Sequence, residues 1–483
     1  MIILYNIRMN VLMVTSEAVP FFKTGGLADM VTSLSSALLK NGDDVRIVMP
    51  LYDEDNQKFS VELMGAADIA LPHSTETIGF GKALDGTLTY YFILHPIWGK
   101  RKGIYGDENG EYDDTLKRQM IFTKGIEKLI SYANFKPDVI HAHDWMTGLV
   151  PYYFKKSYKT VFTIHNIGYQ GKTSAFDAAP IGFVLDESSL ERENDGSLMI
   201  NSLKSAILNA TAITTVSPSY SKEILTPQFG EGLESYLKLR ENSLFGILNG
   251  IDETVWTPSN DKEIKHTYSI KDMSGKEKCK KAVLKEFGFD ENDKRPLIAI
   301  ISRLAWQKGF FEVLKGEGES AIENILSENS CLFAVIGTGD KELEGRFKSL
   351  SEKYSNLSFK NMFSNRLSHL LEAGSDFFFM PSVYEPCGLN QMYSLKYGSV
   401  PIVNSTGGLK DTVIDASRGA KANGFVMDNL DKETIKNTLH RAIMCYTNNK
   451  EYATLQKNGM KASFSWDNGA KEYEAVYKSI IKK

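Results

Sequence analysis

The chain has 483 residues, of which 42% are hydrophobic, so we expect it to bury a sizeable core in two domains of about 200 to 250 residues each. Its formal net charge of −4 excludes a general attraction to nucleic acids or anionic membranes, so any anion must be bound by locally placed residues. The four cysteines lack CxxC spacing, which argues against a disulfide framework or a zinc ribbon and predicts a cytoplasmic location.

No segment has the roughly 18 consecutive apolar residues that a membrane-spanning helix needs, so no membrane association is predicted. The opening residues 1–10 lack the pattern of an export signal. We expect residues 1–8, which precede the first predicted strand, to add no structure.

Short apolar runs alternate with helix-length segments along the whole chain. The first series of runs lies at residues 11–15, 45–50, 138–145, 160–166 and 212–217. The second series lies at residues 296–304, 331–339, 376–382 and 400–408. Runs that are apolar on both faces indicate parallel sheets covered by helices on both sides. The predicted fold class is therefore α/β, with two doubly wound domains and a boundary near the turn-rich residues 249–261.

A glycine pair follows the first predicted strand in the segment KTGGLAD, residues 23–29. Residues 31–40 then repeat apolar side chains at helical spacing, so the pair lies where a strand leads into a helix N-terminus. Glycine lets the backbone approach a phosphate, and the N–H groups of the first helical turn favour negative charge. This corner is predicted to bind an anion.

Two histidines and a carboxylate end another strand of the first series in HAHDW, where strand alternation puts His141 and His143 on one face and Asp144 on the other. The spacing resembles a metal pair, but without a third ligand we favour buried or sugar-facing polar residues. In the next strand, His165 is followed by Asn166 at the start of a loop. His165 is either structural or a substrate contact.

Two basic residues follow the first strand of the second series in SRLAWQKG, residues 302–309. Arg303 and Lys308 are five positions apart and would not share a helix face, so a loop has to bring them together. A guanidinium and an ammonium at a strand end suit a diphosphate. The alternative is a pair of solvated surface cations.

A carboxylate follows the very apolar residues 376–382 in the segment EPCGLNQM. Glu385 either caps the next predicted helix or accepts hydrogen bonds from sugar hydroxyls, while N–H groups from Cys387 onward meet an anion. We interpret Cys387 as a packed thiol rather than a nucleophile. The segment STGGLKDTV, residues 405–413, repeats the glycine pair and either lines the same site or forms a tight strand-to-helix turn.

Taken together, these motifs resemble the family of bacterial glycogen synthases and plant starch synthases. The resemblance covers almost the whole chain and is extended by VSPSYSKEI (216–224), FGEGLE (229–234), NGID (249–252) and FSWDNGAKEYEAVY (464–477). It implies a GT-B fold with Rossmann-like domains at residues 1–248 and 249–464 facing a deep cleft, and a terminal helix at residues 465–483 that crosses back to the first domain. It also implies transfer of glucose from ADP-glucose to the non-reducing end of an α-1,4-glucan with retention of configuration, without a metal or another cofactor.

The resemblance further implies roles for single residues. The catalytic residues would be Glu385 and His165, which position the sugar, with Arg303 and Lys308 on the diphosphate. The donor- and substrate-binding residues would be Lys23, Thr24, Gly25, Gly26, Asp29, Tyr105, Asp144, Asn166, Asn249, Cys387, Gly388, Leu389, Thr406, Gly407 and Gly408. The chain departs from the family pattern at Phe310, Val383 and Tyr384, which could tune the preference for base or sugar.

Several alternatives bear on the substrate and the activity. The donor could be UDP-glucose, or the acceptor could differ, because the nucleoside cannot be identified from these residues. A catalytically silent glucan-binding homologue is disfavoured by the intact Lys23, Arg303, Lys308 and Glu385. A Rossmann oxidoreductase is disfavoured because no GxGxxG with a following acidic residue succeeds any predicted strand. A phosphorylase would need a lysine motif for pyridoxal phosphate, and none is found.

Overall fold

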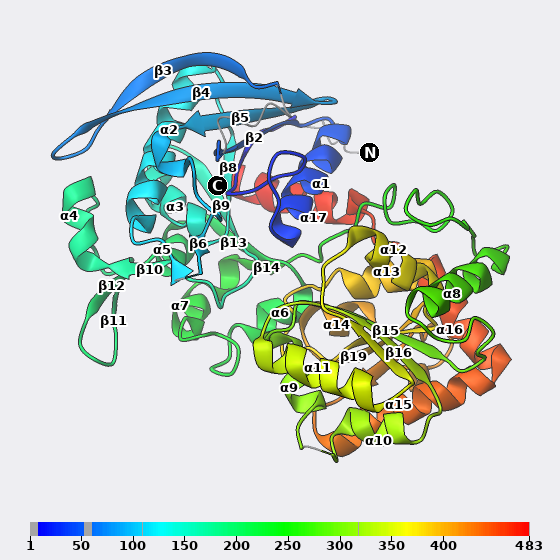
Figure 1. Ribbon diagram of the computed structural model, residues 1–483. Coiled ribbons are helices and arrows are strands. Elements are labelled where there is room, and N and C mark those ends of the chain that lie inside the picture. The colour runs from blue at the N-terminus through cyan, green and yellow to red at the C-terminus, as the bar shows by residue number, and fades with distance from the viewer. Residues whose placement is uncertain (1–7, 53–59, 109, 317, 483) are drawn as a thin grey trace. The chain divides into compact units, whose positions relative to one another are not determined.

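A computed structural model describes residues 8–52, 60–108, 110–316 and 318–482. The chain divides into two compact units (Figure 1). Unit 1 comprises Met1–Val216, Ser221–Gly250 and Trp466–Lys483, and unit 2 comprises Ser217–Tyr220 and Ile251–Ser465. The expectation for residues 1–8 falls outside the described residues except at Arg8. In the described part of the chain, every helix is too short or too polar to span a membrane.

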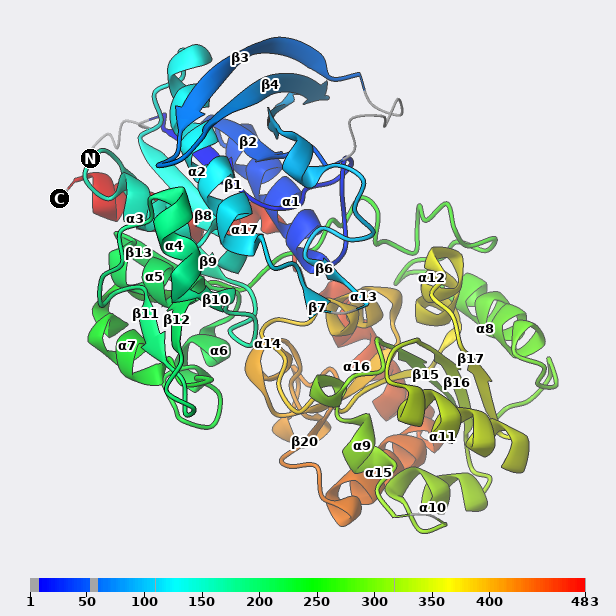
Figure 2. The same ribbon diagram turned by 60° about the vertical axis from the view of Figure 1, so that its left-hand side comes forward.

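Unit 1 is built on one large sheet whose central strands are parallel. In spatial order its strands are β14 (Leu244–Gly246), β13 (Ala212–Thr215), β9 (Lys159–Ile164), β8 (Val139–His143), β1 (Asn10–Val14), β2 (Asp44–Pro50), β5 (Leu88–Leu94), β4 (Thr75–Asp85) and β3 (Glu62–Ala70). The predicted strands of the first series all occur in it. The antiparallel strands β3 and β4, the long ribbons in Figure 2, extend one edge and were not predicted.

The helices of unit 1 connect these strands and cover the sheet. They are α1 (Gly26–Lys40), α2 (Thr115–Tyr132), α3 (Leu149–Phe154), α4 (Ala178–Ile181), α5 (Ser202–Asn209), α7 (Glu234–Leu239) and α17 (Trp466–Ile481). A further helix, α6 (Pro218–Glu223), has residues in both units. Two short sheets complete the unit, formed by β6 (Gly106–Asp107) with β7 (Gly110–Glu111), and by β10 (Lys172–Ser174), β12 (Leu198–Asn201) and β11 (Leu190–Arg192).

Unit 2 is built on a six-stranded parallel sheet. In spatial order its strands are β17 (Leu357–Lys360), β16 (Leu332–Ile336), β15 (Leu297–Ile301), β18 (Phe377–Met380), β19 (Val400–Asn404) and β20 (Phe425–Met427). Its helices are α8 (Ser274–Glu286), α9 (Phe310–Val313), α10 (Ala321–Ser327), α11 (Lys341–Lys353), α12 (Asn365–Gly374), α13 (Asn390–Tyr397), α14 (Gly407–Thr412), α15 (Lys432–Thr447) and α16 (Asn449–Lys461).

Helices cover both faces of the unit 2 sheet, which explains why its strands are apolar on both sides. In β15, Ile298 and Ile300 belong to the core formed with α10, α15 and α16, whereas Leu297 and Ala299 pack on the other face with α8 and α12. The alternation follows from the period of two in an extended strand. The expectation of a parallel sheet buried on both sides is confirmed.

Both sheets have the doubly wound strand order, in which the chain runs outward on one side and then returns to the centre to run outward on the other. The reversal lies between β1 and β8 in unit 1 and between β15 and β18 in unit 2. Ligands of such sheets bind outside the carboxyl ends of the strands at this switch point. The two switch points therefore define where a ligand site is expected.

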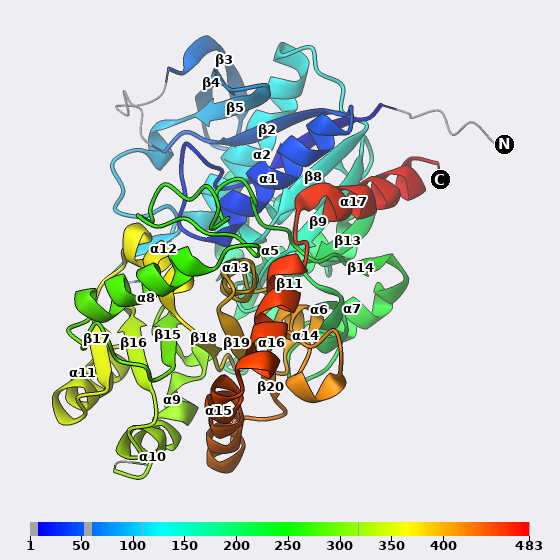
Figure 3. The same cartoon turned by 90° about the vertical axis from the view of Figure 1, so that its right-hand side faces the viewer.

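The last helix, α17, belongs to unit 1 although the segment directly before it, Ile251–Ser465, belongs to unit 2. It packs beside α1, as Figure 3 shows for the helices drawn in red and blue. Its Tyr477 hydroxyl lies 2.7 Å from Nδ1 of His141 in β8, and both residues are fully buried. The terminal helix thus supplies a hydrogen-bond partner to a polar group inside the central sheet.

Tyr477→Phe is expected to lower the free energy of unfolding by about 1 to 3 kcal/mol, because it leaves a buried imidazole nitrogen without its partner. Chemical denaturation followed by circular dichroism measures the change. Tyr153→Phe serves as the matched control, since it loses an exposed hydrogen bond to Glu127 and should cost less than about 1 kcal/mol. Equal losses in the two variants would contradict the structural role given to Tyr477.

Candidate active site

The predicted site residues that follow β1 in unit 1 are organised by Glu17, a residue that the sequence analysis did not single out. Glu17 lies just beyond β1 with only 2% of its surface exposed. Its carboxylate accepts hydrogen bonds from the backbone N–H of Thr24 and of Gly25, and from the Thr24 hydroxyl at 3.0 Å. It also accepts from the Tyr105 hydroxyl at 3.0 Å. One buried carboxylate therefore joins the KTGG loop to Tyr105.

This arrangement corrects one expectation about the KTGG loop. The N–H groups of Thr24 and Gly25 do not face an open anion site, because Glu17 already occupies them. The N-terminus of α1, which begins at Gly26, still has no side-chain cap. Asp29 in the first turn of α1 and Glu17 beside its N-cap already place negative charge near the positive end of the helix dipole, so anion binding at this corner stays a prediction.

Two further predicted residues of this segment pair with each other. The Lys23 ammonium lies 2.7 Å from the Asp29 carboxylate, and half of the Lys23 side chain is exposed. A pair this exposed contributes little to stability. Lys23 can therefore exchange Asp29 for another anion at small cost.

Asp144 lies at the end of β8, on the opposite side of the switch point from the KTGG loop. Burial, with a smaller effect from the Glu17 charge, raises the pKa of Asp144 to about 7. Its backbone has a φ of +60°, an uncommon value outside glycine that is often found at functional sites. The carboxyl group is therefore partly protonated near neutral pH.

The remaining predicted residues of unit 1 also follow strand ends. His165 comes directly after β9, and burial lowers its pKa to about 3, so the ring is neutral. Asn166 accepts a hydrogen bond from the N–H of Gly168 within its own turn. Asn249 is buried, and its Oδ1 has no hydrogen-bond partner among the described residues.

In unit 2, the structure brings Lys308 and Glu385 together. The Lys308 ammonium lies 2.6 Å from Glu385 Oε2, and the Ser382 hydroxyl donates to the same oxygen at 2.9 Å. Glu385 is 6% exposed. The capping interpretation is wrong, because the next helix, α13, has Leu389 at its N-cap and no side-chain cap. Cys387 is buried one residue before the positive-φ Gly388.

Arg303 follows β15, on the other side of the switch point from Glu385. Its side chain is exposed and forms no ion pair with any residue that the structure describes. No contact between Arg303 and Lys308 is found among these residues, so their convergence stays a prediction. The loop that carries Lys308 is nevertheless fixed to the Glu385 segment, because the N–H of Val383 donates to the Gln307 carbonyl at 2.9 Å.

The second glycine pair packs against the Glu385 segment. A Cβ atom on Gly407 would lie 1.9 Å from the Glu385 carbonyl oxygen, and one on Gly408 would lie 2.1 Å from the Cys387 carbonyl oxygen. Thr406, at the N-cap of α14, is buried beside them. Packing therefore requires glycine at both positions, and the assignment of Thr406, Gly407 and Gly408 to the donor stays a prediction.

The first glycine pair has a different environment. Gly25 is exposed with an extended φ of −157°, and a Cβ atom there would meet nothing within 4 Å. Neither backbone conformation nor internal packing requires glycine at this position. The assignment of Gly25 to the ligand stays a prediction.

Sequence departures from the family pattern have a simple structural account at one position. Phe310 is 1% exposed and packs in the core of unit 2, with its ring centroid 5.6 Å from that of Phe347. Because Phe310 lies in the core and not on the surface, its position does not support the suggested influence on the preference for base or sugar. Val383 and Tyr384 are half-buried beside Glu385.

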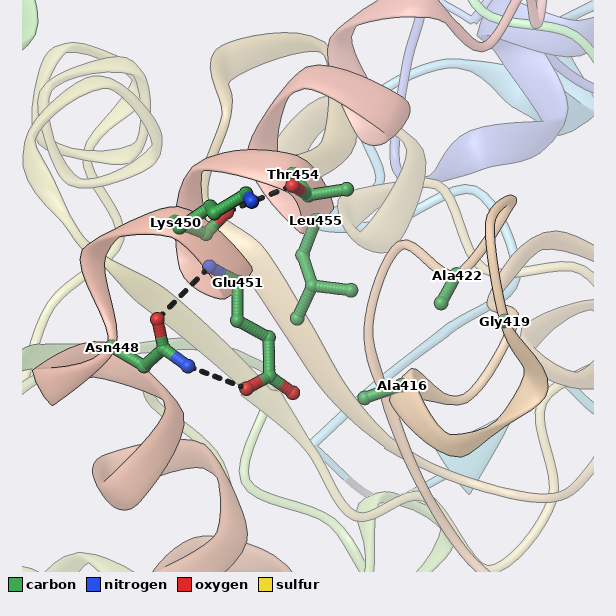
Figure 4. A pocket seen from close by; sticks show the side chains of 8 residues that line it. All are labelled: Ala416, Gly419, Ala422, Asn448, Lys450, Glu451, Thr454 and Leu455. Carbon is green, nitrogen blue, oxygen red and sulfur yellow. Dashed lines mark hydrogen bonds between the residues drawn. The ribbon is translucent and has the colours of Figure 1, made fainter.

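A separate cavity of about 290 Å³ lies in unit 2 where the start of α16 meets the loop at residues 416–422 (Figure 4). Its polar side chains already bind one another, since the Asn448 amide donates to Glu451 at 3.3 Å. None of the predicted site residues lines it. We do not include it in the candidate active site.

Comparison with known proteins identifies the family of the whole chain. Residues 10–239 match the starch synthase catalytic domain, and residues 284–462 match glycosyl transferases group 1. A glycogen synthase from Treponema denticola is 38% identical over 98% of this chain and 99% of its own length, and one from Myxococcus xanthus is 37% identical over 98% and 100%. The chain belongs to the glycogen and starch synthase family. It is thus a glycosyltransferase with glycogen synthase function, as the resemblance implied.

A solved structure of a family member agrees with the fold. The catalytic domain of starch synthase IV from Arabidopsis thaliana, bound to ADP and acarbose, has a TM-score of 0.88 and 30% identity, covering 99% of this chain and 100% of that one. The α/β, GT-B fold class is confirmed. Sucrose-phosphate synthase from Thermosynechococcus elongatus, at 14% identity and a TM-score of 0.61, shares the fold alone.

Gly25→Ala and Gly408→Ala should separate the roles of the two glycine pairs in this synthase. Gly408→Ala forces backbone atoms apart and should lower the free energy of unfolding by about 1 to 3 kcal/mol. Gly25→Ala should change it by less than about 1 kcal/mol yet lower kcat/KM about tenfold, because the methyl group occupies ligand space. Denaturation and steady-state kinetics measure the two effects, and unchanged kcat/KM in Gly25→Ala would show that no ligand closely approaches this residue.

Asp144→Asn should change how stability depends on pH. The pKa of Asp144 is raised in the folded protein from 3.8 to about 7, so between these values the folded state binds a proton that the unfolded chain lacks. This contribution favours folding at low pH and is lost as the pH rises through about 7. A neutral Asn side chain does not titrate, so the variant keeps its stability where the wild type loses this contribution. The unfolding free energy of the variant relative to the wild type should therefore rise between about pH 4 and pH 7. Urea denaturation across this range measures it, and parallel curves would contradict the raised pKa.

Proposed function

We propose that this glycogen synthase extends α-1,4-glucans at their non-reducing ends with glucose from ADP-glucose, retaining the anomeric configuration. The observation that carries the proposal is the contact between Lys308 and Glu385, 2.6 Å apart, at the carboxyl edge of the unit 2 sheet. A partly exposed cation for a diphosphate then lies in contact with a buried carboxylate for sugar hydroxyls. Arg303 follows the neighbouring strand and adds a planar, exposed guanidinium.

The pairing of Lys308 with Glu385 is compatible with diphosphate binding. An ammonium has three N–H donors, so Lys308 can keep its hydrogen bond to Glu385 and still donate to a phosphate oxygen. Both contacts described for the Glu385 carboxylate fall on Oε2, and we assign Oε1 to the sugar hydroxyls. The lysine thereby links the position of the sugar to that of its leaving group.

Departure of the nucleoside diphosphate then needs no strong general acid, because the second pKa of a phosphate group is about 6. The charge that develops on it is stabilised by Arg303 and Lys308, and we propose that no metal is required. The leaving phosphate accepts the proton of the acceptor hydroxyl on the same face of the sugar. Glu385 and His165 position the sugar during this step.

The residues of unit 1 are assigned to the sugar and the glucan acceptor. Asp144 and His165 follow neighbouring strands, and Tyr105 is fixed by Glu17, so this half offers several polar groups on a rigid support. Lys23 is exposed beside its partner Asp29 at the same sheet edge, and we assign it to the donor phosphates. The cytoplasmic location stays a prediction.

The donor assignment is tested by supplying ADP-glucose and UDP-glucose separately with glycogen as primer. We expect kcat/KM to be at least about tenfold higher with ADP-glucose, which corresponds to about 1.4 kcal/mol of transition-state stabilisation. The presence of ADP in the related starch synthase IV supports this choice. Turnover only with UDP-glucose would establish the alternative donor, and turnover with neither would contradict the proposed reaction.

Arg303→Ala tests the role of the guanidinium in the same assay. The variant should lose at least about a hundredfold in kcat while remaining folded, because charge on the leaving group is no longer neutralised. The matched control is Arg346→Ala in α11, an arginine of unit 2 whose partners are Glu342 and the Leu314 carbonyl. Near-normal kcat in Arg303→Ala would refute the assignment.

A further inference from the structure

Three histidine rings lie next to one another in unit 1. The rings of His141 and His143 pack against each other in a tilted arrangement, with centroids 4.1 Å apart and planes at 36°. Nδ1 of His143 then lies 3.2 Å from Nε2 of His165, the residue assigned above to the sugar. A buried strand histidine is therefore in hydrogen-bond contact with a residue of the proposed active site.

The protons on this pair can be assigned from burial. All three histidines have pKa values lowered by burial, so each ring is neutral and carries one N–H. His143 is fully buried, and its Nε2 has no hydrogen-bond partner among the described residues. Because one proton must lie between His143 and His165, only two arrangements preserve their hydrogen bond.

The two arrangements leave different groups unpaired. If His165 donated from Nε2, His143 would carry its proton on Nε2 and bury an N–H without an acceptor. If His143 donates from Nδ1, its Nε2 is a bare lone pair instead. Orphaned buried N–H groups are rarer in proteins than under-satisfied acceptors, so the second arrangement is favoured.

We propose that His143 is a positioning residue that donates from Nδ1 to His165 Nε2 and thereby holds His165 in the tautomer with its proton on Nδ1. His165 then presents an N–H donor, and no acceptor, to a sugar hydroxyl or to an oxygen that gains negative charge during transfer. His165 is partly exposed, and its Nδ1 has no hydrogen-bond partner among the described residues, which leaves this nitrogen for such a contact.

The surrounding structure holds His143 in place. Its neighbour His141 is fixed at both nitrogens, by the Tyr477 hydroxyl at 2.7 Å and the Thr163 hydroxyl at 2.6 Å. The fixed ring of His141 packs against that of His143. A rigid supporting shell of this kind is what keeps a substrate-contacting histidine in one tautomer and orientation.

The tautomer itself is tested on the wild-type protein by nuclear magnetic resonance with ¹⁵N-labelled histidine. The chain has eight histidines, and single His→Gln variants assign their signals. We expect His165 and His143 both to be protonated on Nδ1. A proton on Nε2 of His165 would overturn the proposal, and this measurement is independent of activity.

The positioning role is tested with a matched pair of variants. Asn at position 143 retains an amide N–H close to the place of Nδ1, whereas Leu has a similar size and cannot donate. His143→Leu should lower kcat about tenfold or more with less than about a threefold change in the KM for ADP-glucose, and His143→Asn should stay within about threefold of the wild-type kcat. Equal losses of kcat in folded His143→Leu and His143→Asn would overturn the positioning role. If His143→Leu does not fold, the tautomer measured by nuclear magnetic resonance decides.

The inference about His143 rests on the proposed function of His165. One further variant, at His165, distinguishes a failure of the inference from a failure of the proposed function. A normal kcat in His165→Ala would overturn the positioning role together with the assignment of His165 to the sugar. The tautomer measured in the wild type would still confirm or refute the hydrogen bond from His143. Retained glycogen synthase activity with ADP-glucose in that variant would leave the overall reaction intact.

Discussion

The order of the parallel strands is the constraint on which the candidate site depends. In each sheet the order in which successive strands are added reverses once, at the switch point. The loops that follow the two strands beside this switch point lead to opposite faces of the sheet. The loops after β1 and β8 therefore separate in unit 1, as do those after β15 and β18 in unit 2. Four of the predicted motifs follow these four strands. Within each sheet, topology rather than any single side chain thus brings two motifs that are distant in sequence to one edge.

The sequence was sufficient to predict the central strands and the motifs at their ends, because a strand covered on both faces is apolar throughout and ends abruptly at polar residues. It was insufficient for β3, whose side chains are mostly exposed and which therefore has no continuous apolar run. It was equally insufficient for Glu17. The partners of its carboxylate include Tyr105, 88 positions away, and only the fold brings the two residues together. The one available signal was an acidic residue between an apolar strand and a glycine loop.

The two glycine pairs show why a motif alone cannot identify its physical cause. Both follow a parallel strand and both begin a helix. At Gly407 and Gly408, the neighbouring backbone leaves no space for a Cβ atom, so the pair is needed for packing. At Gly25 that space is open, so packing does not explain the residue. The same two letters therefore have a packing role in unit 2 that is absent at Gly25 in unit 1, where the binding role stays a prediction.

Buried polar groups connect the terminal helix to the site. A parallel strand at the centre of a sheet has no access to water, so histidines on β8 have to find protein partners or lose stability. Tyr477 of α17 meets this requirement for His141, and His141 in turn packs on His143. The return of the chain to unit 1 therefore does more than cover apolar surface. It completes a set of neutral, hydrogen-bonded rings whose last member, His165, reaches the sheet edge where the sugar is proposed to bind.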